Sequence, residues 1–291
     1  MRSYIMSLLA LSLIIVSAFM HATWNYFAKQ SGGGFLFVWL YMAISVVVYA
    51  PVALGVFILQ ESNISWIGAT FILGSTFIHL IYSLTLQKGY KIGDFSLVYP
   101  IARGSGPLIV AACAFFLYDE KLTIISVIGI CLIVVGIFIL TGGIEAFRRL
   151  DTMLPLLYGM FIGFLIASYT LLDKGAVSIV FLSPILLNYG SNLGQFLLLT
   201  PFAVKNRKKI REEWKSNRLP IIAVGVLNPL AYILVLITMV FTPVSYVAPV
   251  RELSILIGTF MGTRLLKEGS GTHRLIAATF MFVGVFAIAI N

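Results

Sequence analysis

Apolar residues follow one another along this chain in long runs, and short polar or charged segments separate the runs. Most runs are close to the roughly 20 residues that an α-helix needs to cross the hydrocarbon core of a bilayer. The pattern therefore predicts ten membrane-spanning helices joined by short connections. We expect them over residues 4–27, 35–58, 66–86, 95–117, 123–140, 153–172, 179–202, 219–241, 245–265 and 275–290.

The composition narrows the class of protein. Of the 291 residues, 60% are hydrophobic and only 11% are charged, which excludes a soluble domain. The first run follows Arg2 and resembles a secretory signal, but nine further runs favour a retained first helix. The predicted fold class is an all-α integral membrane protein.

The distribution of positive charge predicts the orientation. The net charge is +9, and much of it lies in residues 205–218, between two predicted spans. Fifteen of the 20 Lys and Arg residues fall in alternate connections, whereas the opposite side has only Arg2, Lys121 and Lys174. By the positive-inside rule the basic connections are cytosolic, so both termini are expected outside the cytosol of a multi-pass cytoplasmic (inner) membrane protein. A nucleic-acid partner is not expected.

The two halves of the chain repeat each other. Three pairs recur at an offset of 148 residues: Arg103 and Arg251, Glu120 and Glu268, and Gly136 and Gly284. This predicts two five-helix repeats, residues 1–145 and 146–291. Since each half crosses the membrane an odd number of times, the second repeat is inverted, as in many secondary transporters.

Several segments resemble a known family. "HATWNYFAK" (21–29), "GDFSLVYPIARG" (93–104) and "YDEKLT" (118–123) are similar to the EamA family of the drug/metabolite transporter superfamily. "GICLIVVG" (129–136) resembles the glycine motif of the small multidrug resistance proteins in the same superfamily. The resemblance implies ten helices around a central cavity and the exchange or export of small metabolites. Members usually have cytosolic termini, whereas the charge count here predicts the reverse.

Two arginines lie inside predicted spans. Arg103 sits in "YPIARGSGP" (99–107), and Arg251 follows Pro249. The prolines and glycines predict a break in both helices, where half-helix N-termini and arginines would bind a carboxylate, phosphate or phosphonate. Alternatively, Glu252 neutralises the arginines, which then join the spans or act as a gate. Glu252 appears as the only carboxylate well inside a span, and we expect it to pair with Arg103 rather than with its neighbour Arg251.

A second group of candidates has aromatic and polar side chains. On the first span, His21, Trp24 and Asn25 share one helix face that is too polar for lipid. His79, Tyr82 and Tyr99 could join them around a cavity for an organic substrate. Interhelical hydrogen bonding is the alternative role, and for His79 alone it is the one we favour.

The remaining candidates concern gating and packing. Glu120 and Glu268 lie at helix ends, where a conformational role is expected. Gly129, Gly136 and Gly284 place small residues for close helix packing, within a monomer or in a homodimer.

The predicted function is secondary active transport of a small anionic or zwitterionic metabolite, of the amino acid or organophosphorus type, by alternating access. The expected partners are this substrate, the lipid bilayer, and a coupling proton or exchanged solute. A flippase for a phosphate-bearing lipid or lipid-linked sugar and a multidrug exporter remain alternatives. An enzyme is not expected, because no nucleophile and base stand at convincing spacing. Cys113 and Cys131 both lie in apolar runs, so no metal site, disulfide or cofactor is expected.

Overall fold

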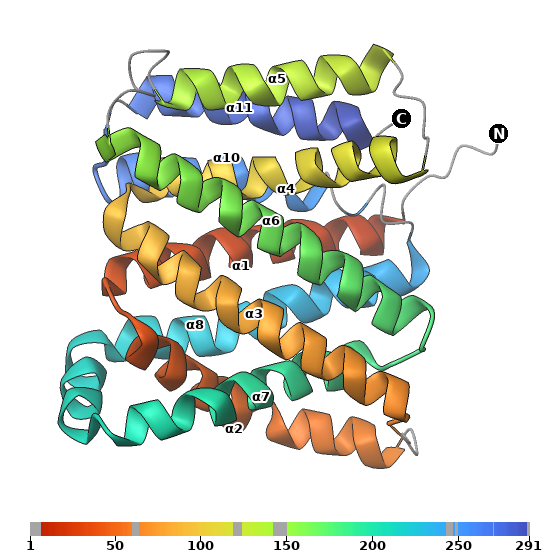
Figure 1. Ribbon diagram of the computed structural model, residues 1–291, viewed down its shortest axis with the longest axis vertical. Helices are drawn as coiled ribbons and strands as arrows, with labels where there is room; N and C mark the ends of the chain where they lie inside the picture. Colours follow the sequence, from red (N-terminus) through yellow and green to blue (C-terminus); the bar gives the residue numbers. More distant parts are fainter. Residues whose placement is uncertain are drawn as a thin grey trace.

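The chain folds into a layered bundle of helices (Figure 1). The computed structural model describes residues 7–59, 64–118, 124–141, 150–242, 247, 250–269 and 271–289. Within these residues all regular structure is α-helical, as the apolar runs predict. The helices are α1 (Leu8–Ser31), α2 (Phe35–Leu59), α3 (Trp66–Ile92), α4 (Phe95–Tyr118), α5 (Ile124–Thr141), α6 (Leu150–Ser178), α7 (Pro184–Val204), α8 (Arg207–Phe241), α10 (Leu253–Arg264) and α11 (Gly271–Ala289).

The helices are those of a membrane protein. In the described residues, α1, α2, α3, α6 and α8 each contain a stretch long and apolar enough to cross a bilayer, and α5 and α11 contain shorter apolar helices. Large apolar side chains such as Leu8, Val47 and Leu59 are exposed on the outside of the bundle. Lipid can cover such a surface, and helices satisfy their own backbone hydrogen bonds within it.

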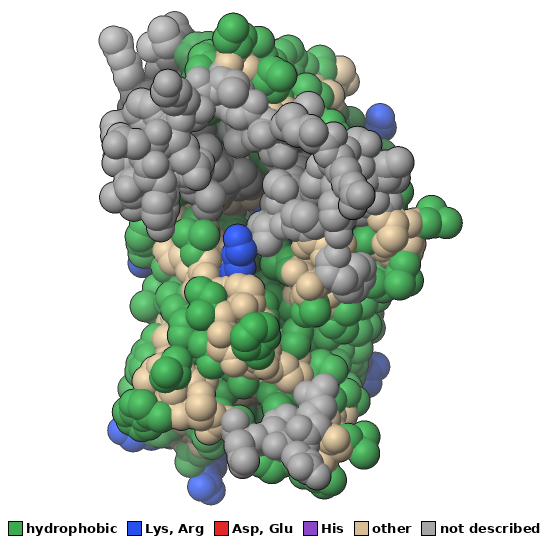
Figure 2. Space-filling model, turned by 90° about the vertical axis from the view of Figure 1, so that its right-hand side faces the viewer, with side chains coloured by type: hydrophobic (Ala, Val, Ile, Leu, Met, Phe, Trp, Pro, Cys, Tyr) green, Lys and Arg blue, Asp and Glu red, His purple; other side chains and the backbone are tan. Residues whose placement is uncertain are grey.

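Successive helices cross the molecule in alternating directions (Figure 1). The start of α1 and the end of α11 lie at one end, here called the terminal end. The α1–α2, α3–α4, α7–α8 and α10–α11 connections lie at the opposite end, here called the basic end. The side chains that Figure 2 draws in colour at the terminal end are mostly hydrophobic, with isolated Lys or Arg side chains. Helices α1 and α6, which begin the two halves, run in opposite directions.

Helix α4 corrects one expectation from the sequence. It is continuous from Phe95 to Tyr118, so the expected break around Pro100 and Gly104 is wrong. A proline removes only one backbone hydrogen bond, and α4 tolerates that loss. Gly104 faces α11 instead, and the end of the Met281 side chain lies where a Cβ would be. The prolines expected to break the ninth span, Pro243 and Pro249, lie outside the described residues.

Several helices extend beyond their expected ends, and the extensions of α8 and α6 both carry charged residues. The basic stretch 205–218, expected as a loop, is largely helical, because α8 begins at Arg207 and kinks at Asn217 (φ −125°, ψ 24°) before it continues. Helix α6 continues to Ser178, whereas its apolar run predicts an end near residue 172. The extension of α6 matters for the site, since it carries a buried carboxylate.

Helices α5 and α11 pack through reciprocal glycine contacts. A Cβ on Gly136 would lie 2.8 Å from the Ala277 carbonyl oxygen, and a Cβ on Gly284 would lie 2.6 Å from the Gly129 carbonyl oxygen. Gly129 and Ala277 are equivalent at the repeat offset of 148, as are Gly136 and Gly284. Each helix thus presents to the other the same two positions of its repeat, which is the pattern of a contact with two-fold pseudo-symmetry. These three glycines therefore pack within one chain.

Candidate functional site

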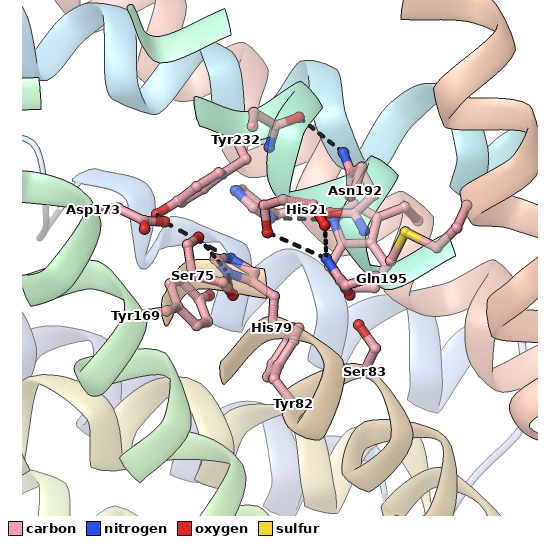
Figure 3. Close-up of a pocket in the computed structure, with 15 residues that line it drawn as sticks. His21, Ser75, His79, Tyr82, Ser83, Tyr169, Asp173, Asn192, Gln195 and Tyr232 are labelled. Atoms are coloured by element: carbon pink, nitrogen blue, oxygen red, sulfur yellow. Dashed lines mark hydrogen bonds and ion pairs between the residues drawn. The ribbon is translucent and has the colours of Figure 1, made fainter. Parts of the chain in front are cut away.

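A small polar cavity lies in the middle of the bundle (Figure 3). Its wall is formed by side chains of α1, α2, α3, α6, α7 and α8. The space open to the centre of a water molecule is about 20 Å³, which is room for one or two waters. The cavity is therefore closed around its polar side chains in this conformation.

An aromatic group surrounds a buried carboxylate on one side of the cavity. Asp173 of α6 is only 1% exposed, and its Oδ2 accepts a 2.7 Å hydrogen bond from the hydroxyl of Tyr232. His79 Nε2 lies 4.0 Å from the same oxygen, and the His79 ring stacks on Tyr169 at a centroid distance of 4.1 Å. Tyr82 and Tyr232 approach the His79 ring edge-on. Figure 3 shows this group with Asp173 at its edge.

The hydrogen bonds of His79 leave its contact with Asp173 weak. The Nδ1 atom lies 3.0 Å from the Ser75 carbonyl oxygen, which can only accept, and 3.1 Å from the Ser75 hydroxyl, so the carbonyl favours a proton on Nδ1. In a neutral ring Nε2 then has no proton to donate to Asp173. A distance of 4.0 Å is also too long for a hydrogen bond.

The α1 side of the cavity presents a donor. The Trp24 indole N–H donates to His21 Nδ1 at 3.1 Å, so the second ring nitrogen, Nε2, carries the proton of the neutral imidazole. This Nε2 is buried and has no hydrogen-bond partner among the described residues.

The two arginines that the sequence analysis singled out, Arg103 and Arg251, form a second buried cluster. Arg103 and Arg251 are 2% and 4% exposed, and Glu252 between them is 0% exposed. Glu252 Oε1 lies 3.1 Å from Arg251 Nη2 and 3.7 Å from Arg103 Nη1. The guanidinium of Arg103 also lies over the Tyr99 ring, 5.7 Å from its centroid. Since one carboxylate faces two guanidinium groups, the cluster carries one more positive than negative charge among the residues that the structure describes.

A network of charged side chains lies at the basic end. Glu268 accepts hydrogen bonds of 2.8 Å from the backbone N–H groups of Phe95 and Ser96, the first two residues of α4. The Lys29 ammonium donates to the carbonyls of Tyr90 and Gly93 and lies 3.9 Å from Glu268. Arg274 lies 3.9 Å from Glu268 and 2.6 Å from Asp94, and it also bonds the Ser96 hydroxyl. Helices α1, α4 and α11 are thus joined through one carboxylate, which also caps an N-terminus.

Comparison with known proteins identifies the family. The model of the EamA-like transporter family matches residues 8–142 and 153–290, nearly the whole chain. The chain belongs to the EamA-like transporter family. Family membership makes this EamA protein a multi-pass membrane transporter of the drug/metabolite transporter superfamily and confirms the resemblance seen in its sequence.

The other comparisons give information about the fold only. No curated protein sequence matches the chain. Among 21 matching solved chains is one described as "Crystal structure of protein", with a TM-score of 0.62. That match covers 97% of this chain and 96% of the other at 14% sequence identity. At this identity the likeness concerns the fold and says nothing of substrate.

The structure divides the candidate residues of this EamA protein into two groups. Four of them line the central cavity: His21, Trp24, His79 and Tyr82. Arg103, Arg251, Glu252 and Tyr99 form the separate buried cluster. Asn25 lies outside the cavity wall, where its Oδ1 accepts a 2.7 Å hydrogen bond from Tyr90. Glu268 lies in the network of the basic end, and its repeat partner Glu120 is outside the described residues.

The structure revises two expectations about carboxylates in this EamA protein. Glu252 pairs with Arg103 as expected, but it also pairs with its neighbour Arg251 and lies closer to it, because residue 252 forms a turn before α10 and the angular spacing of a regular helix does not apply. Glu252 is also not the only carboxylate deep in a helix, since Asp173 is equally buried. The repeat offers a signal for Asp173: "SYTLLDK" (168–174), which contains it, resembles "TWNYFAK" (23–29).

Proposed function

We propose that this protein is a secondary active transporter of a small anionic or zwitterionic metabolite, of the amino acid or organophosphorus type. In this proposal all ten helices cross the cytoplasmic membrane, as two inverted five-helix repeats. The alternating helix directions and the reciprocal α5–α11 contacts support the inverted repeat. The cytosolic side is the basic end, as the charge distribution favours.

The observation that carries the proposal is the cluster of Arg103, Arg251 and Glu252. Two guanidinium groups and one carboxylate are buried together, so within the described part of the chain one positive charge has no counter-ion. Nη1 of Arg103 has no hydrogen-bond partner among the described residues. A buried charge inside a membrane is costly unless it is paired, and a carboxylate or phosphate of a substrate would complete the pairing.

The closed state of the cavity supports alternating access. A space of about 20 Å³ is too small for a metabolite, so the substrate must enter a more open conformation. The network around Glu268 closes the basic end, and its hydrogen bonds join residues of the two halves. Motion of one half against the other would break this network and open the cavity to the cytosol.

A second candidate function is export of organic cations. Such an exporter is expected to have an accessible unpaired carboxylate, and the sequence analysis found none. In the structure, however, Asp173 lines the cavity, and its Oδ1 has no hydrogen-bond partner among the described residues. A flippase remains an alternative, for which a lateral opening to lipid would be needed. The proposal includes coupling to a proton or to an exchanged solute, which transport assays can measure. It also includes a monomeric or homodimeric state, which a mass measurement can determine.

A thermal-shift screen of the purified protein tests the substrate class. Anionic, zwitterionic and cationic metabolites are added singly to the parent protein and to Arg103→Gln and Arg251→Gln. A ligand at 100 times its dissociation constant stabilises the folded state by about 2.7 kcal/mol. Acidic or zwitterionic compounds should raise the Tm of the parent, and each arginine variant should lose at least part of that shift.

The control is Lys215→Gln, which removes one positive charge from an exposed position on α8. It should respond as the parent does. Stabilisation by cations or lipids alone, or a response that survives both arginine substitutions, would refute the proposed substrate class.

A further inference from the structure

The first part of α8 runs in a different direction from the rest of that helix. Residues 207–217, here called the basic helix, precede the long part of α8, and the backbone leaves helical geometry at Asn217 (φ −125°, ψ 24°). In Figure 1 the basic helix lies at the basic end, between α7 and the long part of α8, and runs across the direction of the long helices. It therefore lies parallel to the plane of the membrane that the long helices cross.

One face of the basic helix packs on the protein. Residues three or four apart lie on the same side of a helix, and the half-buried positions of this stretch are Asn206, Ile210, Glu213 and Asn217. Ile210 packs against the main hydrophobic core, and Glu213 Oε1 accepts a 2.9 Å hydrogen bond from the Asn217 amide. A Cβ on Gly33, in the α1–α2 connection, would lie 3.2 Å from the same oxygen. The Glu213 carboxylate is thus turned towards the protein.

The remaining sides of the basic helix carry exposed positive charge. Successive residues of a helix point about 100° apart, so Arg207, Lys208 and Lys209 alone cover three directions. Glu212 is the one exposed carboxylate of residues 205–218, all of which the structure describes. No basic side chain of this stretch forms an ion pair with another described residue. The exposed basic residues of the stretch are Lys205, Arg207, Lys208, Lys209, Arg211, Lys215 and Arg218.

The neighbouring residues set the depth of the basic helix in the membrane. Phe202 and Val204 at the end of α7 are exposed apolar side chains, and so are Leu219 and Ile222 after the kink. Because lipid covers such side chains, the chain leaves the hydrocarbon region near Val204 and returns to it near Leu219. The basic helix between them lies at the level of the headgroups. Trp214, which is 37% exposed there, belongs to a residue type that is enriched at this level.

The chemistry of this surface selects its partner. Anionic phospholipids carry phosphate groups at the level of the headgroups, and clustered Lys and Arg side chains are attracted to them. Seven exposed cations face only one exposed carboxylate in this stretch. A soluble acidic protein would have to approach from the aqueous side, whereas lipid phosphates already surround a helix at this depth. The exposed tryptophan and the apolar residues on both sides of the helix also favour lipid.

We propose that the basic helix is an interfacial helix that binds the phosphate headgroups of anionic phospholipids at the basic end. Binding there holds the start of α8, and later residues of the same helix, Asn228 and Tyr232, line the central cavity. The inference goes beyond the proposed function and does not depend on which substrate is transported.

The test places a fluorescent probe on the basic helix in a bilayer of known composition. Cys113 and Cys131 are replaced by alanine, and Ser216→Cys carries the probe at an exposed position. The full-length protein is reconstituted in nanodiscs of phosphatidylglycerol and phosphatidylcholine in equal amounts. Two samples of identical composition are compared, one with brominated phosphatidylglycerol and one with brominated phosphatidylcholine. Because bromine quenches the probe only at short range, the comparison reports which lipid lies beside the helix.

We expect brominated phosphatidylglycerol to quench the probe at least about threefold more strongly than brominated phosphatidylcholine at low ionic strength, because several cations act together. Replacing Arg207, Lys209 and Arg211 together by glutamine should bring the two lipids within about 1.5-fold, since this removes cations from several sides of the helix. About 0.5 M sodium chloride should have the same effect on the parent, because salt screens exposed charges.

The matched control removes three exposed positive charges from other helices at the same end of the protein. Lys88→Gln, Lys91→Gln and Arg264→Gln are combined in one variant, which should keep the preference for phosphatidylglycerol. If this variant loses the preference as fully as the triple variant of the basic helix, the effect belongs to the total charge of the protein and the proposal is wrong.

The remaining outcomes also decide the question. Equal quenching by the two lipids in the parent at low salt, or a preference that survives the triple substitution in the basic helix, would overturn the proposal. Absence of quenching by either lipid would show that the helix stands away from the bilayer and is open to a soluble acidic partner, which would equally refute it. The salt dependence needs the parent alone, so it applies even if a triple variant does not fold. A negative result in the thermal-shift screen of metabolites would refute the proposed substrate class and leave this inference standing.

Discussion

Replacing Glu268 by glutamine should open the basic end of the protein. The carboxylate accepts hydrogen bonds from the N–H groups of Phe95 and Ser96, each at 2.8 Å, and from the Ser96 hydroxyl at 2.8 Å. A hydrogen bond to a charged group contributes about 1.5–3 kcal/mol, and a glutamine has only one acceptor oxygen for these donors. The closed conformation should lose at least about 2 kcal/mol, which corresponds to a roughly 30-fold rise in the open population.

The open population can be measured by thiol labelling. Cys113 and Cys131 are replaced by alanine, and Thr259→Cys introduces a single thiol at a fully buried position of α10. A water-soluble maleimide should label this thiol at least tenfold faster when Glu268 is glutamine. Glu212→Gln makes the same change of charge at an exposed position of α8 and should leave the rate unchanged.

A labelling rate within twofold of the parent, in a folded Glu268→Gln protein, would refute the assignment of Glu268 to a gate. The carboxylate would then be a helix cap that stays in place through the transport cycle. A large fall in Tm with no change in labelling would lead to the same conclusion.

Three further predictions concern packing and buried charge. Gly284→Ala places a Cβ 2.6 Å from the Gly129 carbonyl and should lower the stability by about 1–3 kcal/mol in a denaturation series, whereas Gly55→Ala, with no atom within 4 Å, should not. Tyr90→Phe removes the hydrogen bond to Asn25 and should cost about 1–3 kcal/mol in the same assay, with ligand affinity unchanged. Glu252→Gln leaves two buried guanidinium groups unpaired and should destabilise by about 3–5 kcal/mol. Added sulfate should restore part of its Tm and should have less effect on the parent.

The sequence predicts the fold well because the membrane imposes a simple rule. A span needs a long apolar run, so the order and approximate places of the helices can be read from the chain, although the ends of α3, α6 and α8 lie well beyond their runs. The contact between α5 and α11 could also be anticipated, since equivalent small residues recur at one offset. The alternating directions of the helices follow from the short connections, which turn the chain back after each helix.

The errors arise where a side chain's role depends on a neighbouring helix. Gly104 appears in the sequence as a helix breaker, but in the structure it makes room for Met281 of a distant helix. Asp173 lies one residue beyond an apolar run, which is typical of a loop, yet α3 and α8 cover it with His79 and Tyr232. Apolar periodicity reports on the surface towards lipid, whereas these contacts lie on the opposite faces of the helices.

The positions of the buried charges suggest how substrate binding could be coupled to motion. Arg103 lies in the first half of the chain and Glu252 in the second, and the same is true of His79 and Asp173. The Arg103–Glu252 ion pair and the longer His79–Asp173 contact therefore both join the two halves. A substrate anion that paired with Arg103 would compete with Glu252 and weaken the ion pair that joins the halves. The contact that selects an anion would then also be the contact that must loosen for the halves to move.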